Sequence, residues 1–150
     1  MWYKESLESI LKKAVSKEKD AYLIYKNAAN ETKNTYVKTV LNNLAEKELK
    51  HIQIIEDFDI KKLQWQEVAI DGESHEWISE YLISKDEAPS KDIEFKDLFA
   101  YAAKREKKSY EFYTAMSNFI DDSELKKLFA WLAQEEKKHE SDLVWNLMYH

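Results

Sequence analysis

Hydrophobic residues recur along most of this chain at alternating steps of three and four positions. Near the N-terminus the series includes Leu7, Leu11 and Ala14, and it continues through Ala21 and Tyr25. This spacing places hydrophobic side chains on one face of an α-helix, whereas a β-strand alternates at every second position. The same pattern returns in three later segments. The predicted helices cover residues 4–30, 35–58, 94–119 and 123–148.

Two short turns and one long connection join the predicted helices. Residues 31–35 form the first turn and residues 121–123 the second, where Asp122 or Ser123 can cap the following helix. Helices joined by such short turns pack as antiparallel hairpins. The connection over residues 59–93 has no steady period, although its middle, SHEWISEYLIS, can form a short helix.

The length of this connection and the composition narrow the fold class. One Gly and one Pro in 150 residues leave few helix breaks. A connection of this length can cross a whole bundle, so we predict an all-α fold, a ferritin-like four-helix bundle in which two duplicated helical hairpins are joined by a crossover. We expect this single domain to cover residues 1–150.

Charge and hydropathy exclude several classes of partner. The net charge is −6 with both signs interspersed, which argues against nucleic acid because no basic stripe is present. No apolar run approaches the roughly 18 residues that a membrane span needs. The N-terminal segment MWYKESLESILKK carries acidic residues, unlike the apolar region of a signal peptide. We therefore expect a soluble, cytoplasmic protein that binds neither nucleic acid nor membrane.

Six polar residues interrupt the hydrophobic faces of the four predicted helices, and they are related by an internal repeat. The six are Glu18, Glu48, His51, Glu106, Glu136 and His139. Adding 88 to the number of each of the first three gives one of the last three. The two glutamates of each hairpin are also equidistant from its turn, at position 33 or position 121. We therefore expect all four carboxylates to lie in one layer of the bundle.

Four buried carboxylates require positive charge, because an unpaired buried ion is costly. No Lys or Arg occupies the same series of positions, and two divalent cations would supply the missing charge. One Glu from each of two helices, together with Glu-x-x-His from each of the other two, is the ligand set of a dinuclear centre. Two imidazoles and four carboxylates suit iron, with manganese as the alternative, better than structural zinc.

A single Glu-x-x-His would be weak evidence in a chain with 29 acidic residues, because such a spacing readily arises on a charged surface. The duplication and the position within the hydrophobic faces favour the metal site. By contrast, His75 and His150 have neither feature, and we expect both to face solvent. The charged runs KEKD and KREKK are expected to be solvated, apart from the one Glu in each that lies on the hydrophobic face.

Four tyrosines lie near the predicted site, and no catalytic residue is assigned. The candidates for supporting the metal ligands are Tyr22, Tyr25, Tyr110 and Tyr113. Tyr25 and Tyr113 lie seven residues beyond Glu18 and Glu106, so their hydroxyls could bond a carboxylate of the other hairpin. The alternative is that all four tyrosines are ordinary core residues. Two tryptophans are expected between helices or at a dimer surface: Trp131 and Trp145.

The ordered segments EKDAYLIY, LAEKELKH, EKKSYEFY and LAQEEKKH resemble the rubrerythrin-like branch of the ferritin-like superfamily. The resemblance covers most of the chain outside the crossover. It implies that Glu48 and Glu136 bridge or cap two irons and that His51 and His139 each bind one. Two further glutamates, Glu18 and Glu106, would complete the opposite side. Rubrerythrins reduce hydrogen peroxide with electrons delivered through a rubredoxin-like domain, whose iron is held by four cysteines.

Two departures from that family bear on function. This chain has no cysteine, so the electrons would come from an external donor, such as a rubredoxin-like protein or a flavoprotein. Ser109 stands where rubrerythrins carry an extra carboxylate. We expect a non-haem diiron oxidoreductase acting on peroxide or dioxygen, and a homodimer. The alternatives are iron binding or ferroxidation for storage or delivery, and a partner-binding helical module with a vestigial site.

Overall fold

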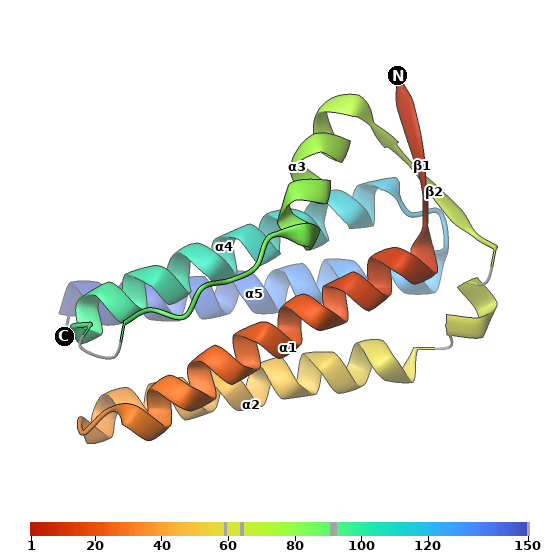
Figure 1. Ribbon diagram of the computed structural model, residues 1–150. Helices are drawn as coiled ribbons and strands as arrows, with labels where there is room; N and C mark the ends of the chain where they lie inside the picture. Colours follow the sequence, from red (N-terminus) through yellow and green to blue (C-terminus); the bar gives the residue numbers. More distant parts are fainter. Residues whose placement is uncertain (59, 64, 91–92, 150) are drawn as a thin grey trace.

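Four long helices dominate the computed structural model, which describes residues 1–58, 60–63, 65–90 and 93–149. In Figure 1, α1 lies beside α2, and α4 lies beside α5. Their bounds agree with the predicted ones to within three residues. The four helices are α1 (Leu7–Glu31), α2 (Thr35–Asp57), α4 (Phe95–Phe119) and α5 (Ser123–Tyr149). The predicted mainly helical fold is confirmed.

Side-chain caps explain where three of these helices begin. The Oγ of Ser6 accepts a hydrogen bond from the backbone N–H of Ser9 at the start of α1, at 3.3 Å. Asn34 caps α2 in the same way. At α5 the Oδ1 of Asp122 accepts from the backbone N–H of Leu125 at 2.9 Å. Each cap satisfies a backbone donor that has no partner within the helix.

A two-stranded antiparallel sheet departs from the all-α prediction. Strand β1 (Trp2–Ser6) pairs with β2 (Glu67–Asp71), so the predicted helical start at residue 4 is wrong. Val68 and Ile70 are buried, whereas Glu67 and Ala69 are exposed. This alternation of period two covers only five residues, and the pairing strand lies more than 60 residues away in the sequence.

The rest of the long connection contains a short 3-10 helix, η1 (Ile60–Leu63), and an α-helix, α3 (Gly72–Ile83). Helix α3 includes the predicted SHEWISEYLI segment and is capped by Asp71, whose Oδ1 accepts from the backbone N–H of Ser74 at 2.8 Å. After α3, residues 84–90 run back along α4 without regular structure (Figure 1). The crossover therefore covers one side of the helices as well as joining them.

The hydrophobic core is divided into two clusters by a polar layer. On α1, residues up to Val15 belong to one cluster and residues from Ala21 onward to the other. The same division occurs on the other three long helices. On all four helices the six polar residues identified from the sequence lie between the clusters. Two dry regions therefore enclose a central layer of charge.

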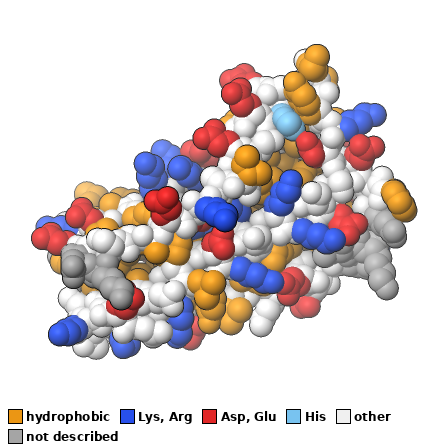
Figure 2. Space-filling view, in the orientation of Figure 1, with side chains coloured by type: hydrophobic (Ala, Val, Ile, Leu, Met, Phe, Trp, Pro, Cys, Tyr) orange, Lys and Arg blue, Asp and Glu red, His pale blue; other side chains and the backbone are white. Residues whose placement is uncertain are grey.

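The surface shows no concentration of one charge on the face seen in Figure 2, where acidic and basic side chains are intermixed. Among the described residues, no helix is long and apolar enough to cross a membrane.

Replacing Asp122 by alanine should lower the free energy of unfolding by about 1 kcal/mol, because the N-terminal turn of α5 loses its cap. Asp121→Ala is the matched control, since Asp121 is exposed and adjacent. Urea unfolding of both variants in the same metal state measures the difference. Equal stability of the two variants would contradict the assignment of the cap.

Candidate metal centre

The six polar residues that interrupt the hydrophobic faces come together in the central layer. Helices α1 and α4 each contribute one glutamate, and α2 and α5 each contribute one glutamate and one histidine. None of the six side chains is more than 2% exposed. They are Glu18, Glu48, His51, Glu106, Glu136 and His139.

These side chains form two overlapping groups of four. In each group, one ligand atom from every member lies within 4.8 Å of the others. The first group contains Glu18, Glu48, His51 and Glu136, and the second contains Glu48, Glu106, Glu136 and His139. Because Glu48 and Glu136 belong to both groups, their carboxylates lie between two positions that could each hold a metal ion.

Every member of the layer has at least one buried polar atom without a hydrogen-bond partner. These atoms are Oε2 of Glu18 and Glu106, both carboxylate oxygens of Glu48 and Glu136, and Nδ1 of His51 and His139. Buried polar atoms are normally paired, since leaving one unsatisfied costs about 1–3 kcal/mol. Some of these atoms approach one another: Nδ1 of His51 lies 2.9 Å from Oε1 of Glu136, and Nδ1 of His139 lies 3.6 Å from Oε2 of Glu106. Carboxylate oxygens and imidazole nitrogens gathered in this way fit a hard or borderline cation.

Aromatic rings cover the two histidines. The rings of His51 and His139 are stacked, with centroids 5.5 Å apart and planes at 11°. Trp131 lies edge-on to His51 at 5.9 Å, although its side chain is 43% exposed. Trp131 therefore contacts a candidate ligand, which its position on the helix surface did not predict.

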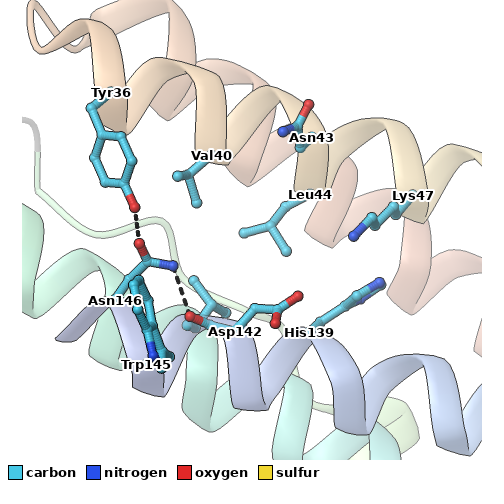
Figure 3. A pocket seen from close by; sticks show the side chains of 10 residues that line it. Tyr36, Val40, Asn43, Leu44, Lys47, His139, Asp142, Trp145 and Asn146 are labelled. Carbon is cyan, nitrogen blue, oxygen red and sulfur yellow. Dashed lines mark hydrogen bonds between the residues drawn. The ribbon is translucent and has the colours of Figure 1, made fainter. Parts of the chain in front are cut away.

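A pocket of about 290 Å³ opens between α2 and α5 and is lined in part by His139 (Figure 3). Lys47 and Asp142 lie at its walls near the histidine, and Tyr36 and Trp145 lie toward its other end. The hydroxyl of Tyr36 donates a hydrogen bond to the side-chain oxygen of Asn146 across this pocket. Trp145 lines this pocket but is 54% exposed, and its ring packs against Tyr149 of the same helix, so its expected place between helices or at a dimer surface stays a prediction.

Two tyrosines hold carboxylates of the opposite hairpin. The hydroxyl of Tyr25 on α1 donates to Oε1 of Glu106 on α4, and the hydroxyl of Tyr113 on α4 donates to Oε1 of Glu18 on α1, both at 2.8 Å. These are the contacts that the spacing made available. Since each bond uses Oε1, it leaves Oε2 of the same carboxylate facing the centre.

The other two tyrosine candidates lie farther from the chemistry. Tyr22 and Tyr110 are partly buried and pack against the hydrophobic clusters. The ring of Tyr110 lies beneath the ammonium group of Lys137, at 5.3 Å from the centroid. Their contacts are those of core aromatics, the alternative considered for all four tyrosines.

Two basic residues expected at the solvated surface are instead buried. Arg105 is 5% exposed and Lys17 is 3% exposed. Nη1 of Arg105 lies 3.8 Å from Oε1 of Glu106 and 4.0 Å from Oε1 of Glu48. The guanidinium also donates from Nη2 to the backbone oxygen of Lys17 at 3.0 Å. The expectation that the KEKD and KREKK runs are solvated apart from one Glu each is therefore wrong at these positions.

Asp86 of the crossover explains how both cations can be buried. Its carboxylate lies 3.4 Å from Nε of Arg105 and 3.4 Å from Nζ of Lys17. Lys17 also donates to the backbone oxygen of Ser84 at 3.1 Å. Lys17 and Arg105 are also related by the repeat of 88 residues, so their equivalent positions were visible in the sequence. Their counter-ion, however, comes from a segment that has no periodic pattern.

Ser109, at the position of the extra carboxylate of rubrerythrins, is fully buried. Its Oγ lies 2.9 Å from the hydroxyl of Tyr81 on α3. The ring of Tyr81 stacks on Phe112 with centroids 4.9 Å apart. A tyrosine of the crossover thus approaches the site where that family has an acidic side chain.

His75 is not a solvent-facing residue. Its Nε2 lies 2.8 Å from Oε1 of Glu5, and its ring stacks on Tyr3 at 4.4 Å. The side chain is 22% exposed. Both partners belong to β1, the strand that the sequence did not predict, which explains why His75 appeared to lack a partner. His150 lies outside the described residues.

Burial dominates the electrostatics of the metal-free centre. It raises the pKa of Glu18 to about 7 and the pKa of Glu136 well above the ordinary value of 4.5. Burial also acts to raise the pKa of Glu106, but contacts with Glu136 and His139 and the charge of Arg105 lower it to about 2. Desolvation and the neighbouring His139 lower the pKa of His51 to about 4.

These shifts predict that the metal-free protein loses stability as the pH rises above neutrality. Glu18 and Glu136 bind protons more tightly in the folded state, so their contribution is complete below pH 4.5 and is lost as pH rises through their folded pKa values. His51 acts in the opposite direction, but only below its ordinary pKa of 6.5. Between about pH 6.5 and 8 the free energy of unfolding should therefore fall, by about 1 kcal/mol from Glu18 alone and further through Glu136.

Urea unfolding of chelator-treated protein at several pH values measures this effect. Glu136→Gln should make the profile flatter, whereas the control Glu135→Gln, one residue away and paired with Lys138, should not. A wild-type profile that is flat or rises over the same range would contradict the prediction.

Comparisons with known proteins agree with this geometry. No curated protein matches the chain. A solved structure of a hypothetical protein from Pyrococcus furiosus is 27% identical in sequence and has a TM-score of 0.74, covering 95% of this chain and 89% of that one. The family model of rubrerythrin matches residues 9–144, which include all four long helices in whole or in large part and all six residues of the central layer. The chain therefore belongs to the rubrerythrin family.

Proposed function

We propose that this protein is a non-haem diiron oxidoreductase that reduces peroxide or dioxygen with electrons from an external donor. The observation that carries the proposal is the convergence of four buried carboxylates and two buried imidazoles in two groups that share Glu48 and Glu136. Eight of their ligand atoms have no hydrogen-bond partner and approach mainly one another, as Nδ1 of His51 and Oε1 of Glu136 do at 2.9 Å. Membership of a family of diiron carboxylate proteins supports it. We propose two iron ions per chain, with manganese as the alternative.

In this proposal Glu48 and Glu136 would contact both ions. Glu18 and His51 would complete one position, and Glu106 and His139 the other. A bound iron pair supplies two electrons for reduction of an O–O bond and a coordination position at which that bond can be activated. The protein residues contribute a fixed ligand geometry.

Hydrogen bonds from outside the ligand set fix that geometry. Tyr25 and Tyr113 hold Glu106 and Glu18 so that one oxygen of each remains directed to the centre. The two hydrophobic clusters exclude water from above and below the layer. The pocket that reaches His139 is a route by which a molecule as small as peroxide can approach.

A second candidate function is ferroxidation or iron binding for storage or delivery. Ser109 favours it, because the chain has no carboxylate at the position where rubrerythrins carry an extra one, and Tyr81 takes up room beside it. In that case iron would be the substrate, and oxidation would stop when the sites are full. For the catalytic function we propose an external donor of the rubredoxin or flavoprotein class and a homodimeric protein.

The proposed ligand register is tested by two pairs of glutamates that are close in the sequence but lie on different faces of their helix. Glu136→Ala and Glu48→Ala should each abolish binding of two metal ions per chain. Glu135→Ala and Glu46→Ala should not, because each residue along a helix rotates the side chain by about 100°, and Glu135 and Glu46, one and two residues away, lie off the buried face. Elemental analysis after anaerobic loading with Fe²⁺ measures the content. Equal metal loss within a pair would refute the register.

Turnover distinguishes the two candidate functions. Protein loaded with Fe²⁺ should consume many equivalents of hydrogen peroxide per chain when excess reduced rubredoxin is supplied, and Glu136→Ala should consume none above background. The readout is the oxidation of rubredoxin followed by its absorbance. Consumption that stops after one oxidation of the bound iron, despite remaining reductant, would favour the ferroxidase alternative.

A further inference from the structure

The internal repeat makes the two groups of candidate ligands equivalent, but the charges beside them are not. Lys17 and Arg105 occupy equivalent positions, each directly before a glutamate of the central layer. Both side chains are buried. Lys17 directs its ammonium group to Ser84 and Asp86 on the crossover. Among the ion pairs of the described residues, only Arg105 of these two approaches carboxylates of the central layer.

Arg105 is nearer to one group than to the other. Its Nη1 lies 3.8 Å from Glu106, which belongs only to the group that contains His139. It lies 4.0 Å from Glu48, which belongs to both groups. Neither Nη1 nor Nε of Arg105 has a hydrogen-bond partner among the described residues. Hydrogen bonds from these two atoms therefore do not offset the positive charge of the guanidinium. A guanidinium stays protonated in proteins, which makes this a permanent charge.

A permanent positive charge beside a carboxylate weakens the binding of a metal cation by that carboxylate. The repulsion acts at full burial, where solvent and salt screen it little. Asp86 offsets part of it from 3.4 Å, on the side of Nε. Besides burial, the charge of Arg105 also acts to lower the pKa of Glu18 and of His51, which belong to the other group. Its ion-pair contacts with the layer among the described residues, however, are with Glu106 and Glu48, and this geometry favours an effect on the position formed with Glu106 and His139.

An independent feature distinguishes the same position. His139 lines the pocket between α2 and α5, so an ion bound there would lie beside an opening (Figure 3). Arg105 itself lines a separate cavity of about 450 Å³ beneath α3, together with Asp86 and Lys108. Substitution of Asp86 can therefore change the charge around Arg105 and leave the candidate metal ligands unchanged.

We propose that the two metal positions are unequal: the position at His139 binds its ion more weakly and fills last, and the charges of Arg105 and Asp86 set the difference. This inference rests on the proposed dinuclear centre. It adds an order in which the two metal positions fill. The ligand set alone does not predict such an order, because the two positions have the same types of ligand.

Calorimetric titration of the metal-free full-length chain with Co²⁺ tests the inference without any enzymatic turnover. We expect two binding steps per chain whose dissociation constants differ by about tenfold or more, as for a charge effect of moderate size. His139→Ala should remove the weaker step and leave the tighter one. His51→Ala should remove the tighter step.

Charge variants then test the cause. Arg105→Gln should strengthen the weaker step and narrow the gap, whereas Arg105→Lys, which keeps the charge, should retain most of it. Asp86→Asn should weaken that step further, because Arg105 loses its counter-ion. Lys108→Gln is the matched control, since Lys108 is exposed and lines the same cavity, and it should leave both steps unchanged. If Arg105→Gln fails to fold, Asp86→Asn still gives a change of defined sign.

The outcomes separate this inference from the proposed function. Two steps of equal affinity, a reversed assignment of the histidines, or a gap that neither Arg105→Gln nor Asp86→Asn changes would overturn the inference and leave the dinuclear centre standing. Failure of the wild-type chain to bind Co²⁺ at all would overturn both.

Discussion

The burial of four carboxylates in one layer is the constraint on which the rest of the structure depends. Each of the four long helices gives one glutamate to this layer, and hydrophobic clusters lie on both sides of it. Tyrosine hydroxyls and one guanidinium satisfy part of the charge, but eight ligand atoms have no hydrogen-bond partner. Such atoms are costly to leave unpaired in a buried layer, and bound cations of the kind proposed above would supply the positive charge that offsets this cost.

Duplication shapes how that charge is held. Tyr25 supports a glutamate of the second hairpin, and Tyr113 supports one of the first, so each hairpin completes the polar layer of the other. The hairpins are therefore joined by directed bonds as well as by hydrophobic packing. The equivalent positions of Lys17 and Arg105 show the limit of the duplication: a single aspartate on the crossover lies against both side chains, and only the arginine also reaches the carboxylates.

The sequence was sufficient to predict the four long helices and the approach of the six polar residues, because both follow from periodicity within helices and from the repeat. It was insufficient wherever the partner came from the crossover or the N-terminus. The five-residue strand β2 is too short for its alternation to stand out, and His75 has its partners on β1. Arg105 lay in a charged run that looked solvated, since its counter-ion Asp86 is 19 residues away in a segment without regular structure. The contact between Tyr81 and Ser109 could not be predicted for a similar reason, because the position of α3 depends on tertiary packing.

The pairing of β1 with β2 also has a consequence for how the chain folds. The contacts between Trp2 and Asp71 close a loop that contains the whole first hairpin, whereas the two hairpins themselves are built from neighbouring helices joined by short turns. Local contacts of this kind form early in folding. The entropic cost of closing a long loop is smaller when other contacts have already brought its ends close together. The first hairpin should therefore bring the ends of β1 and β2 together before the strands pair. The sheet would then form late in folding and hold the crossover on one side of the helices.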